Sequence, residues 1–192
     1  MGVTASFGVD YDPAAGATGN DHDAVATKDS GKGSGSGAVV KLSHDSGLTI
    51  GAGMESINSN SGNDAEAENV TAYALYTMGP VSIGYQGYYL DGGTTTLGGD
   101  GNADSVDYSG DAVGIAFNVN DQVSIGYQKI SEDKHATAAA DVTRDIKSLS
   151  AAYSAGGMTM SIQQTDTDNY SMLTAGNELD TETVQVTLSF AF

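Results

Sequence analysis

The chain has no cysteine, no tryptophan and only 2 prolines among its 192 residues. Without cysteine there is no disulfide, no thiolate nucleophile and no cysteine-ligated metal. The chain also lacks any stretch close to the roughly eighteen consecutive apolar residues of a membrane-spanning helix, and its mean hydropathy is -0.22. These absences exclude a disulfide-stabilised scaffold, a cysteine-dependent enzyme and a helical membrane protein.

Basic residues are scarce as well. The chain carries 7 lysines and arginines against 25 aspartates and glutamates, which gives a formal net charge of -18 at pH 7. A surface of this sign repels phosphate backbones, so we predict no nucleic-acid partner. Most of the acidic residues fall in long polar segments between apolar runs.

Residues suited to catalysis are few. The three histidines, His22, His44 and His135, occur in no metal-ligand spacing, and the chain has no Gly-x-Ser-x-Gly nucleophile motif. A catalytic triad is recognised by its geometry in space, and the sequence gives no reason to pair a serine or an aspartate with any of these histidines. We therefore predict no catalytic residue, no enzymatic activity and no cofactor.

The abundant feature of the chain is strict alternation of apolar and polar residues in short runs. In residues 184–192, three aliphatic residues and two phenylalanines alternate with Gln185, Thr187, Ser189 and Ala191. Such alternation gives a strand one apolar and one polar face, and about nine to eleven residues suffice for a tilted strand to cross a bilayer. The same pattern predicts further strands at residues 3–11, 38–44, 48–54, 70–78, 81–89, 113–119, 123–127, 149–153 and 158–162.

The connections between these runs alternate in length. Short turns rich in Gly, Asn and Asp, which favour tight reversals, are predicted at residues 45–47, 79–80, 120–122 and 155–157. Long polar segments are predicted at residues 12–36, 57–69, 91–105, 131–145 and 165–180. The hexapeptide Val-Ser-Ile-Gly-Tyr-Gln occurs at both 81–86 and 123–128, directly after a short turn each time, which supports a series of equivalent hairpins.

Short turns on one side and long loops on the other are typical of bacterial outer-membrane barrels, whose short turns are periplasmic and whose long loops are extracellular. We therefore predict an all-β fold, an antiparallel up-and-down transmembrane β-barrel with about ten strands in this chain. Residues 1–192 are expected to form a single barrel domain. Closure would leave no strand edge with unsatisfied backbone groups in hydrocarbon.

Alternation assigns each side chain of a strand to one of two faces. The inward face is predicted to be hydrophilic, and its pore-lining candidates are Asp10, Lys41, Glu55, Gln86, Gln128, Gln185 and, near a strand mouth, Arg144. The outward face is predicted to carry a girdle of aromatic rings, which prefer the headgroup boundary. Its members are Tyr11, Tyr76, Tyr89, Tyr108, Tyr127, Tyr153, Phe190 and Phe192. Lys129 and Lys147 are also predicted to face outward, but both lie at strand ends next to long loops. There the free-energy cost of placing a charge against lipid is small.

The acidic segment after residue 95 partly matches a calcium-binding loop. The candidates Asp100, Asn102, Asp104 and Asp111 match positions one, three, five and twelve of such a loop. Ser105 stands where the loop needs Gly, the last ligand is Asp where Glu is required, and no helices flank it. We therefore interpret the segment as an ordinary polar loop and predict no metal site.

The terminal strand 184–192, the hairpins rich in Gly and Tyr, and the acidic loops together resemble a general porin of Gram-negative bacteria, over essentially the whole chain. The resemblance implies an outer-membrane location, a homotrimer, contact with outer-membrane lipid and lipopolysaccharide, and recognition of Phe192, together with Phe190, by the outer-membrane assembly machinery. Porins of this family usually have sixteen strands and an inward loop opposite a ladder of basic residues. This chain has only about ten predicted strands and too few basic residues to form such a ladder. It is expected to be either the C-terminal portion of a larger porin or a smaller barrel that closes alone.

The resemblance implies passive diffusion of small hydrophilic solutes and ions through a water-filled channel. Because Asp10 and Glu55 point inward and acidic loops surround the mouth, we predict a mild preference for cations. Two alternatives remain open from the sequence. One is a small non-conducting outer-membrane barrel, and the other is a surface adhesin. In both, the long acidic loops would bind an external partner or divalent cations.

Overall fold

A computed structural model describes residues 2–12, 32–59, 66–95, 104–136, 140–173 and 178–190. These residues form one antiparallel sheet of ten strands that follow one another in chain order. The strands are β1 (Val3–Asp12), β2 (Lys32–His44), β3 (Leu48–Ser59), β4 (Glu66–Met78), β5 (Val81–Thr95), β6 (Asp104–Asn118), β7 (Val123–Ala136), β8 (Val142–Ala155), β9 (Met158–Asp168) and β10 (Thr181–Phe190). None of the described residues belongs to a helix that is long and apolar enough to span a membrane. The predicted all-β, up-and-down architecture is confirmed.

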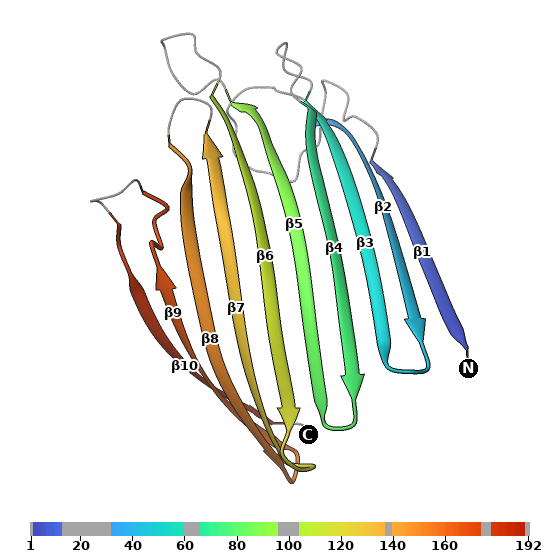
Figure 1. The fold of residues 1–192 in the computed structure, drawn as a ribbon, viewed down its shortest axis with the longest axis vertical. Coiled ribbons are helices and arrows are strands. Elements are labelled where there is room, and N and C mark those ends of the chain that lie inside the picture. Colours follow the sequence, from blue (N-terminus) through green and yellow to red (C-terminus); the bar gives the residue numbers. More distant parts are fainter. Residues whose placement is uncertain are drawn as a thin grey trace.

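The two outer strands, β1 and β10, lie at opposite margins of a curved sheet (Figure 1). Among the described residues, β1 pairs only with β2 and β10 pairs only with β9. The side chains of Phe7 and Val9 on β1 are 85% and 81% exposed. Both margins of the described sheet therefore present backbone groups that need a strand partner wherever hydrocarbon surrounds them.

Most strands are longer than the alternation predicts, mainly at the ends away from the short turns. For example, β6 begins at Asp104, where the alternating run begins at residue 113, and β7 continues to Ala136, where the run ends at residue 127. The β7–β8 ladder runs on through the pair of Glu132 with Arg144. Backbone pairing does not require an apolar face, so a ladder can continue into polar sequence beyond the bilayer. The predicted long segments are correspondingly shorter in the structure.

The short turns lie where they were predicted, and local chemistry explains two of them. Gly47 has a φ of 91°, and a Cβ at this position would stand 2.0 Å from the carbonyl oxygen of Thr77, so only glycine fits. In the β6–β7 turn, the side-chain oxygen of Asn120 accepts hydrogen bonds from the backbone N–H groups of Gln122 at 2.8 Å and Val123 at 2.9 Å. An Asx turn of this kind reverses the chain without glycine.

Strand register divides the sheet into two chemically distinct faces. The register shifts only between Lys32 and Gly35 and between Asp91 and Thr94, both at strand ends next to long connections. One cross-strand row reads Thr77, Ser82, Ala116, Gly126, Ser150, Gln163 and Gln185. The adjacent row reads Met78, Val81, Phe117, Ile125, Ala151, Ile162 and Val186. We call these the polar face and the apolar face, and they match the predicted inward and outward parity.

The register corrects one member of the predicted aromatic girdle. Tyr108 pairs with Leu90 on β5 and with Lys134 on β7, in the same row as Asn69 and Glu55, and so belongs to the polar face. It lies five residues before the outward Val113, and an odd step along a strand reverses the face. Phe192 lies outside the described residues.

Candidate functional site

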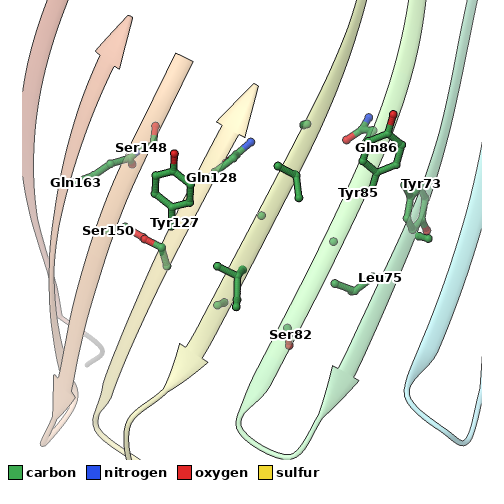
Figure 2. A pocket seen from close by; sticks show the side chains of 18 residues that line it. Tyr73, Leu75, Ser82, Tyr85, Gln86, Tyr127, Gln128, Ser148, Ser150 and Gln163 are labelled. Atoms are coloured by element: carbon green, nitrogen blue, oxygen red, sulfur yellow. The ribbon is translucent and has the colours of Figure 1, made fainter. Parts of the chain in front are cut away.

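A groove of about 520 Å³ lies along the polar face between β4 and β9 (Figure 2). Its polar side chains are Tyr73 on β4, Ser82 and Gln86 on β5, Gln128 on β7, Ser148 and Ser150 on β8 and Gln163 on β9. None of the residues that line it is charged, although the chain as a whole has a net charge of -18. Volumes of a few hundred Å³ are typical of small-molecule sites.

Hydrogen bonds within the sheet orient the polar side chains at both ends of this groove. Gln86 Nε2 donates to Thr71 Oγ1 at 3.0 Å, and the Thr71 hydroxyl donates to the carbonyl of Gly87 at 3.2 Å. At the other end, Gln163 Nε2 donates to Thr165 Oγ1 at 3.3 Å. The side chain of Gln128 has no hydrogen-bond partner in the part of the chain that the structure describes and is exposed to solvent.

Aromatic rings on the polar face lie over glycines of the neighbouring strand. A Cβ at Gly51 would stand 2.4 Å from Cε1 of Tyr73, and a Cβ at Gly110 would stand 2.6 Å from Cζ of Tyr88. Each glycine therefore provides the space that a ring occupies. Neither tyrosine was among the residues predicted to face inward, although each lies two residues from one that was, Thr71 or Gln86.

An ion pair lies above the groove, toward the long connections. Arg144 Nη2 donates to Glu132 Oε1 at 2.5 Å, and the Tyr88 hydroxyl donates to Glu132 Oε2 at 2.5 Å. The side chains of Arg144 and Glu132 are only 26% and 13% exposed. Arg144 thus lies on the polar face as predicted, but a carboxylate that was expected in a loop neutralises its charge.

The other predicted pore-lining residues also fall on the polar face. Lys41 lies in the row that joins Ser6 to Gln86, and Gln185 pairs with Gln163. Asp10 and Glu55 share a row nearer the long connections, where Asn69 Nδ2 donates to Glu55 Oε2 at 3.3 Å. Extension of the same row to β7 reaches Lys134, which was not predicted because the alternating run ends at residue 127.

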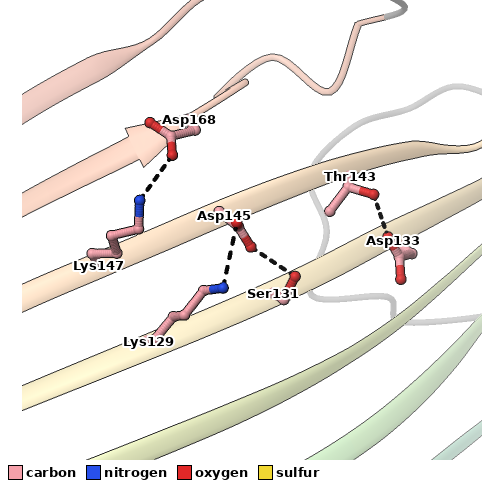
Figure 3. Close-up of polar contacts among 7 residues, drawn as sticks. All are labelled: Lys129, Ser131, Asp133, Thr143, Asp145, Lys147 and Asp168. Atoms are coloured by element: carbon pink, nitrogen blue, oxygen red, sulfur yellow. Dashed lines mark hydrogen bonds and ion pairs between the residues drawn. The ribbon is translucent and has the colours of Figure 1, made fainter.

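On the side of the long connections, the apolar face carries charged residues from the pair that follows Tyr127 and Leu149. Figure 3 shows these charged residues and their contacts. We call this region the charged belt, and its members are Lys129, Ser131, Asp133, Thr143, Asp145, Lys147 and Asp168. Lys129 Nζ lies 3.5 Å from Asp145 Oδ2, and Lys147 Nζ lies 3.1 Å from Asp168 Oδ2. The Ser131 hydroxyl donates to Asp145 at 2.7 Å, and Thr143 donates to Asp133 at 2.5 Å.

These contacts shift two ionisation equilibria in the charged belt. The hydrogen bond from Ser131 lowers the pKa of the Asp145 carboxyl, Lys129 lowers it further, and partial burial opposes the change. The hydrogen bond and the charge of Asp168 raise the pKa of the Lys147 ammonium. Both charged forms are therefore favoured in the folded protein.

The structure also brings a serine, a histidine and an aspartate together on the apolar face. Ser109 Oγ lies 3.1 Å from His135 Nε2, and His135 Nδ1 lies 3.1 Å from Asp141 Oδ2. This is the order of a nucleophile, a base and an orienting carboxylate, which the sequence gave no reason to expect. Asp107, Asp111 and Asp133 surround Ser109 on this face, and acidic neighbours oppose a developing oxyanion, so we assign no reaction to the group.

The calcium alternative stays untested. Of its four candidate residues, Asp111 lies within β6 and Asp104 is the first residue of that strand. Asp100 and Asn102 lie outside the described residues, and the described residues contain no group of three or more His, Asp or Glu side chains that could hold a metal.

No protein-family model matches the chain, and no curated protein matches it. Three solved structures of OmpT, an outer membrane protein of Vibrio cholerae, share its architecture. The in-vitro folded form has 17% identity and a TM-score of 0.58, and the match covers 74% of this chain and 51% of that chain. The form expressed in the outer membrane has 17% identity and a TM-score of 0.57, with 72% and 49% covered. A loop L8 deletion mutant has 15% identity and a TM-score of 0.56, with 85% and 69% covered.

The fold is that of an outer-membrane β-barrel. The predicted location in the bacterial outer membrane is confirmed through this fold, since the neighbours are outer-membrane proteins. The chain spans about half the length of the first two structures that it matches. The resemblance to an outer-membrane barrel protein is therefore confirmed at the level of the fold.

The prediction that the chain has no enzymatic activity is wrong, because the chain shares its fold with barrels named OmpT and this fold gives no ground for excluding catalysis. At 17% identity the likeness concerns the fold and assigns no catalytic residue to this chain.

Proposed function

We propose that the polar face lines a water-filled channel, through which small hydrophilic solutes and ions diffuse across the outer membrane. The observation that carries this proposal is the register. Over the described strands, Ser, Thr, Gln and Gly residues follow one another on one face, while Val, Ile, Leu and aromatic residues follow one another on the other. A two-faced sheet of this kind separates water from lipid.

Small residues on the polar face favour an open lumen over a filled one. A small barrel that does not conduct is packed with inward side chains. Here the polar face carries a glycine on each of several neighbouring strands, at Gly51, Gly53, Gly84, Gly110, Gly114 and Gly126. Only Gly51 and Gly110 are covered by a ring at less than 3 Å from the position of a Cβ.

A mild preference for cations follows from the charges that remain uncompensated. The net charge of the chain is -18. On the polar face, Asp10 and Glu55 share a row with Lys134, Lys41 lies nearer the short turns, and the positive charge of Arg144 is neutralised by Glu132. The preference therefore depends on the excess of acidic residues in the long segments. Acidic groups around a pore mouth raise the local concentration of cations.

We also propose the assembly that accompanies such a channel. The exposed apolar face would contact outer-membrane lipid, and the charged belt would lie at the level of lipopolysaccharide headgroups. Phe190 ends β10 with a side chain that is 56% exposed, which suits recognition of the terminal strand by the outer-membrane assembly machinery. A homotrimer stays a prediction from the resemblance to porins.

The test is conductance of the refolded chain in a planar bilayer, with the reversal potential measured under a gradient of potassium chloride. The proposal expects stepwise openings and a reversal potential of the sign that marks cation selectivity. A folded protein that inserts into the bilayer and never conducts would contradict it. An open channel that selects anions would contradict the cation preference alone.

A further inference from the structure

We propose that the groove on the polar face binds neutral, hydroxyl-rich solutes, namely short saccharides, while they pass through the channel. This inference rests on the proposed function and specifies the solute class that the channel wall recognises. It starts from a contrast in charge. The chain is strongly acidic, yet none of the residues that line the groove is charged.

Charged side chains of the polar face lie outside this groove. Asp10, Lys41 and Glu55 lie on β1, β2 and β3, whereas the groove begins at β4. Arg144 and Glu132 lie nearer the long connections and neutralise each other. A charged solute in the groove would therefore lose water without gaining an opposite charge, and that loss costs free energy. A neutral solute avoids this cost.

The groups that the groove offers match sugar hydroxyls. A primary amide has two donors and an acceptor oxygen, a hydroxyl has a donor and an acceptor, and a sugar hydroxyl needs both kinds of partner. Gln86, Gln128 and Gln163 come from β5, β7 and β9, so successive amides are two strands apart. Each amide is also offset by two residues along the strands from the next one, so successive amides are on the order of 12 Å apart, which leaves space for a ring between them.

The amides are available in different degrees. Gln86 and Gln163 each use Nε2 in a hydrogen bond to a threonine, which restrains the side chain, and neither carbonyl oxygen has a hydrogen bond among the described residues. The Gln128 amide has no partner among the described residues, so all its groups are available. Figure 2 places Gln128 between the other two, with Ser148 and Ser150 on the adjoining strand.

Tyr73 closes one end of the groove with an aromatic surface. Its ring lies over Gly51, because a Cβ there would stand 2.4 to 2.8 Å from Cε1, Cζ and Oη. The neighbouring strand thus holds the ring from behind. A tyrosine held in this way presents an apolar body and a polar tip, which suits the C–H face and the hydroxyls of a sugar ring.

The experiment adds maltose to one side of a bilayer that contains the refolded chain and records the open-channel current. We expect a saturable decrease of the current with maltose. Gluconate and glucosamine, which are charged and of monosaccharide size, are expected to give no saturable decrease, and glucose is expected to give one. Each of Gln128→Ala and Gln163→Ala is expected to raise the half-saturating maltose concentration about two- to ten-fold, since each removes neutral hydrogen bonds.

Gln164→Ala is the matched control. Gln164 is the residue after Gln163 on β9, lies on the apolar face, and donates to Glu182 Oε1 at 2.9 Å. Its loss should leave the maltose response unchanged. A channel that conducts but responds to maltose without saturation, or responds equally in all the variants, overturns the inference and leaves the proposed function standing. A chain that does not conduct overturns the proposed function itself.

Discussion

Lys129 and Lys147 stand directly opposite each other in the β7–β8 ladder, and each reaches a different carboxylate. Like charges in directly opposed positions destabilise a sheet. Asp145 lies 3.5 Å from Lys129, and Asp168 lies 3.1 Å from Lys147, so the repulsion is offset on both strands. Two residues closer to the short turns, Tyr127 and Leu149 form the next pair on the same face. We therefore predict that the boundary between lipid and headgroups falls between these two rows.

The first prediction concerns the part of the apolar face that contacts lipid. Ile125 lies in the row of Ile162 and Val186, well inside the boundary. Ile125→Arg should lower the free energy of unfolding by about 2 to 4 kcal/mol, because a basic side chain in the bilayer is poorly solvated. Urea unfolding in liposomes measures the change. Ser124→Arg, one residue away on the polar face, should change stability little, and an equal loss for both would contradict the assignment of the faces.

The second prediction concerns the pH dependence of stability through the charged belt. The pKa of Asp145 is lowered from 3.8, so its stabilising contribution is fully present above pH 3.8 and is lost as the pH falls through the folded-state value. The pKa of Lys147 is raised from 10.5, so its contribution is fully present below pH 10.5 and is lost as the pH rises through its folded-state value. Both contributions are constant across neutral pH.

NMR titration of the Asp145 carboxyl measures the first of these shifts directly. Ser131→Ala should raise the pKa of Asp145 toward its ordinary value, because the hydrogen bond from Ser131 is the largest cause of the shift. Thr143→Ala removes a hydroxyl that bonds to Asp133 and should leave Asp145 unchanged. A carboxyl that titrates above 3.8 in the unmodified protein would refute the contact.

The third prediction concerns the ion pair on the polar face. Arg144→Gln leaves Glu132 without its cation on the channel wall, so the preference for cations should increase. The free energy of unfolding should also fall by about 1 to 3 kcal/mol, since a part-buried carboxylate loses a charged hydrogen bond. Reversal potentials and urea unfolding report the two effects. Lys147→Gln removes the same charge from the apolar face, and a similar gain in selectivity there would show that Arg144 has no special position.

The fourth prediction concerns the space that glycine provides for an inward ring. A Cβ at Gly110 would stand 2.6 Å from Tyr88 Cζ and 2.8 Å from the carbonyl oxygen of Ser131. Gly110→Ala should therefore lower stability by about 1 to 3 kcal/mol, as overpacking does. At Gly87 the nearest atom would be Tyr85 Oη at 3.9 Å, so Gly87→Ala should be close to neutral. Comparable losses at the two positions would argue against the packing of Tyr88 over Gly110.

The sequence alone could predict the short turns, the number of strands and the face of nearly every side chain. All of these depend on a period of two residues between glycine- and asparagine-rich turns, because successive side chains of a strand point to opposite faces and the two faces of a spanning strand meet different surroundings. The loop-side strand ends could not be predicted, because beyond the bilayer neither face of β6 or β7 has to be apolar. How far each of these strand ends extends depends on how far the neighbouring strand continues to pair with it.

Cross-strand contacts were equally beyond the sequence. The pairing of Arg144 with Glu132, and the packing of Tyr73 over Gly51, depend on which residues face each other on neighbouring strands. Register is fixed only when turn lengths and both strands are considered together. Arg144 was predicted only to lie near a strand mouth, and because β8 extends to Val142 it lies on the polar face, an even number of residues from Ser150.

The central claim is that the polar face meets water and the apolar face meets lipid. Because the chain has no cysteine, single cysteines can be introduced as unique labels, one in place of Ser150 and one in place of its neighbour Leu149. Each variant is inserted into a planar bilayer, and a membrane-impermeant, charged thiol reagent is added while the channel current is recorded. We predict that Ser150→Cys reacts and that the current through the channel falls, while Leu149→Cys stays unmodified. Rapid reaction of Leu149→Cys together with an unreactive Ser150→Cys would contradict the assignment of the two faces and the channel built on it.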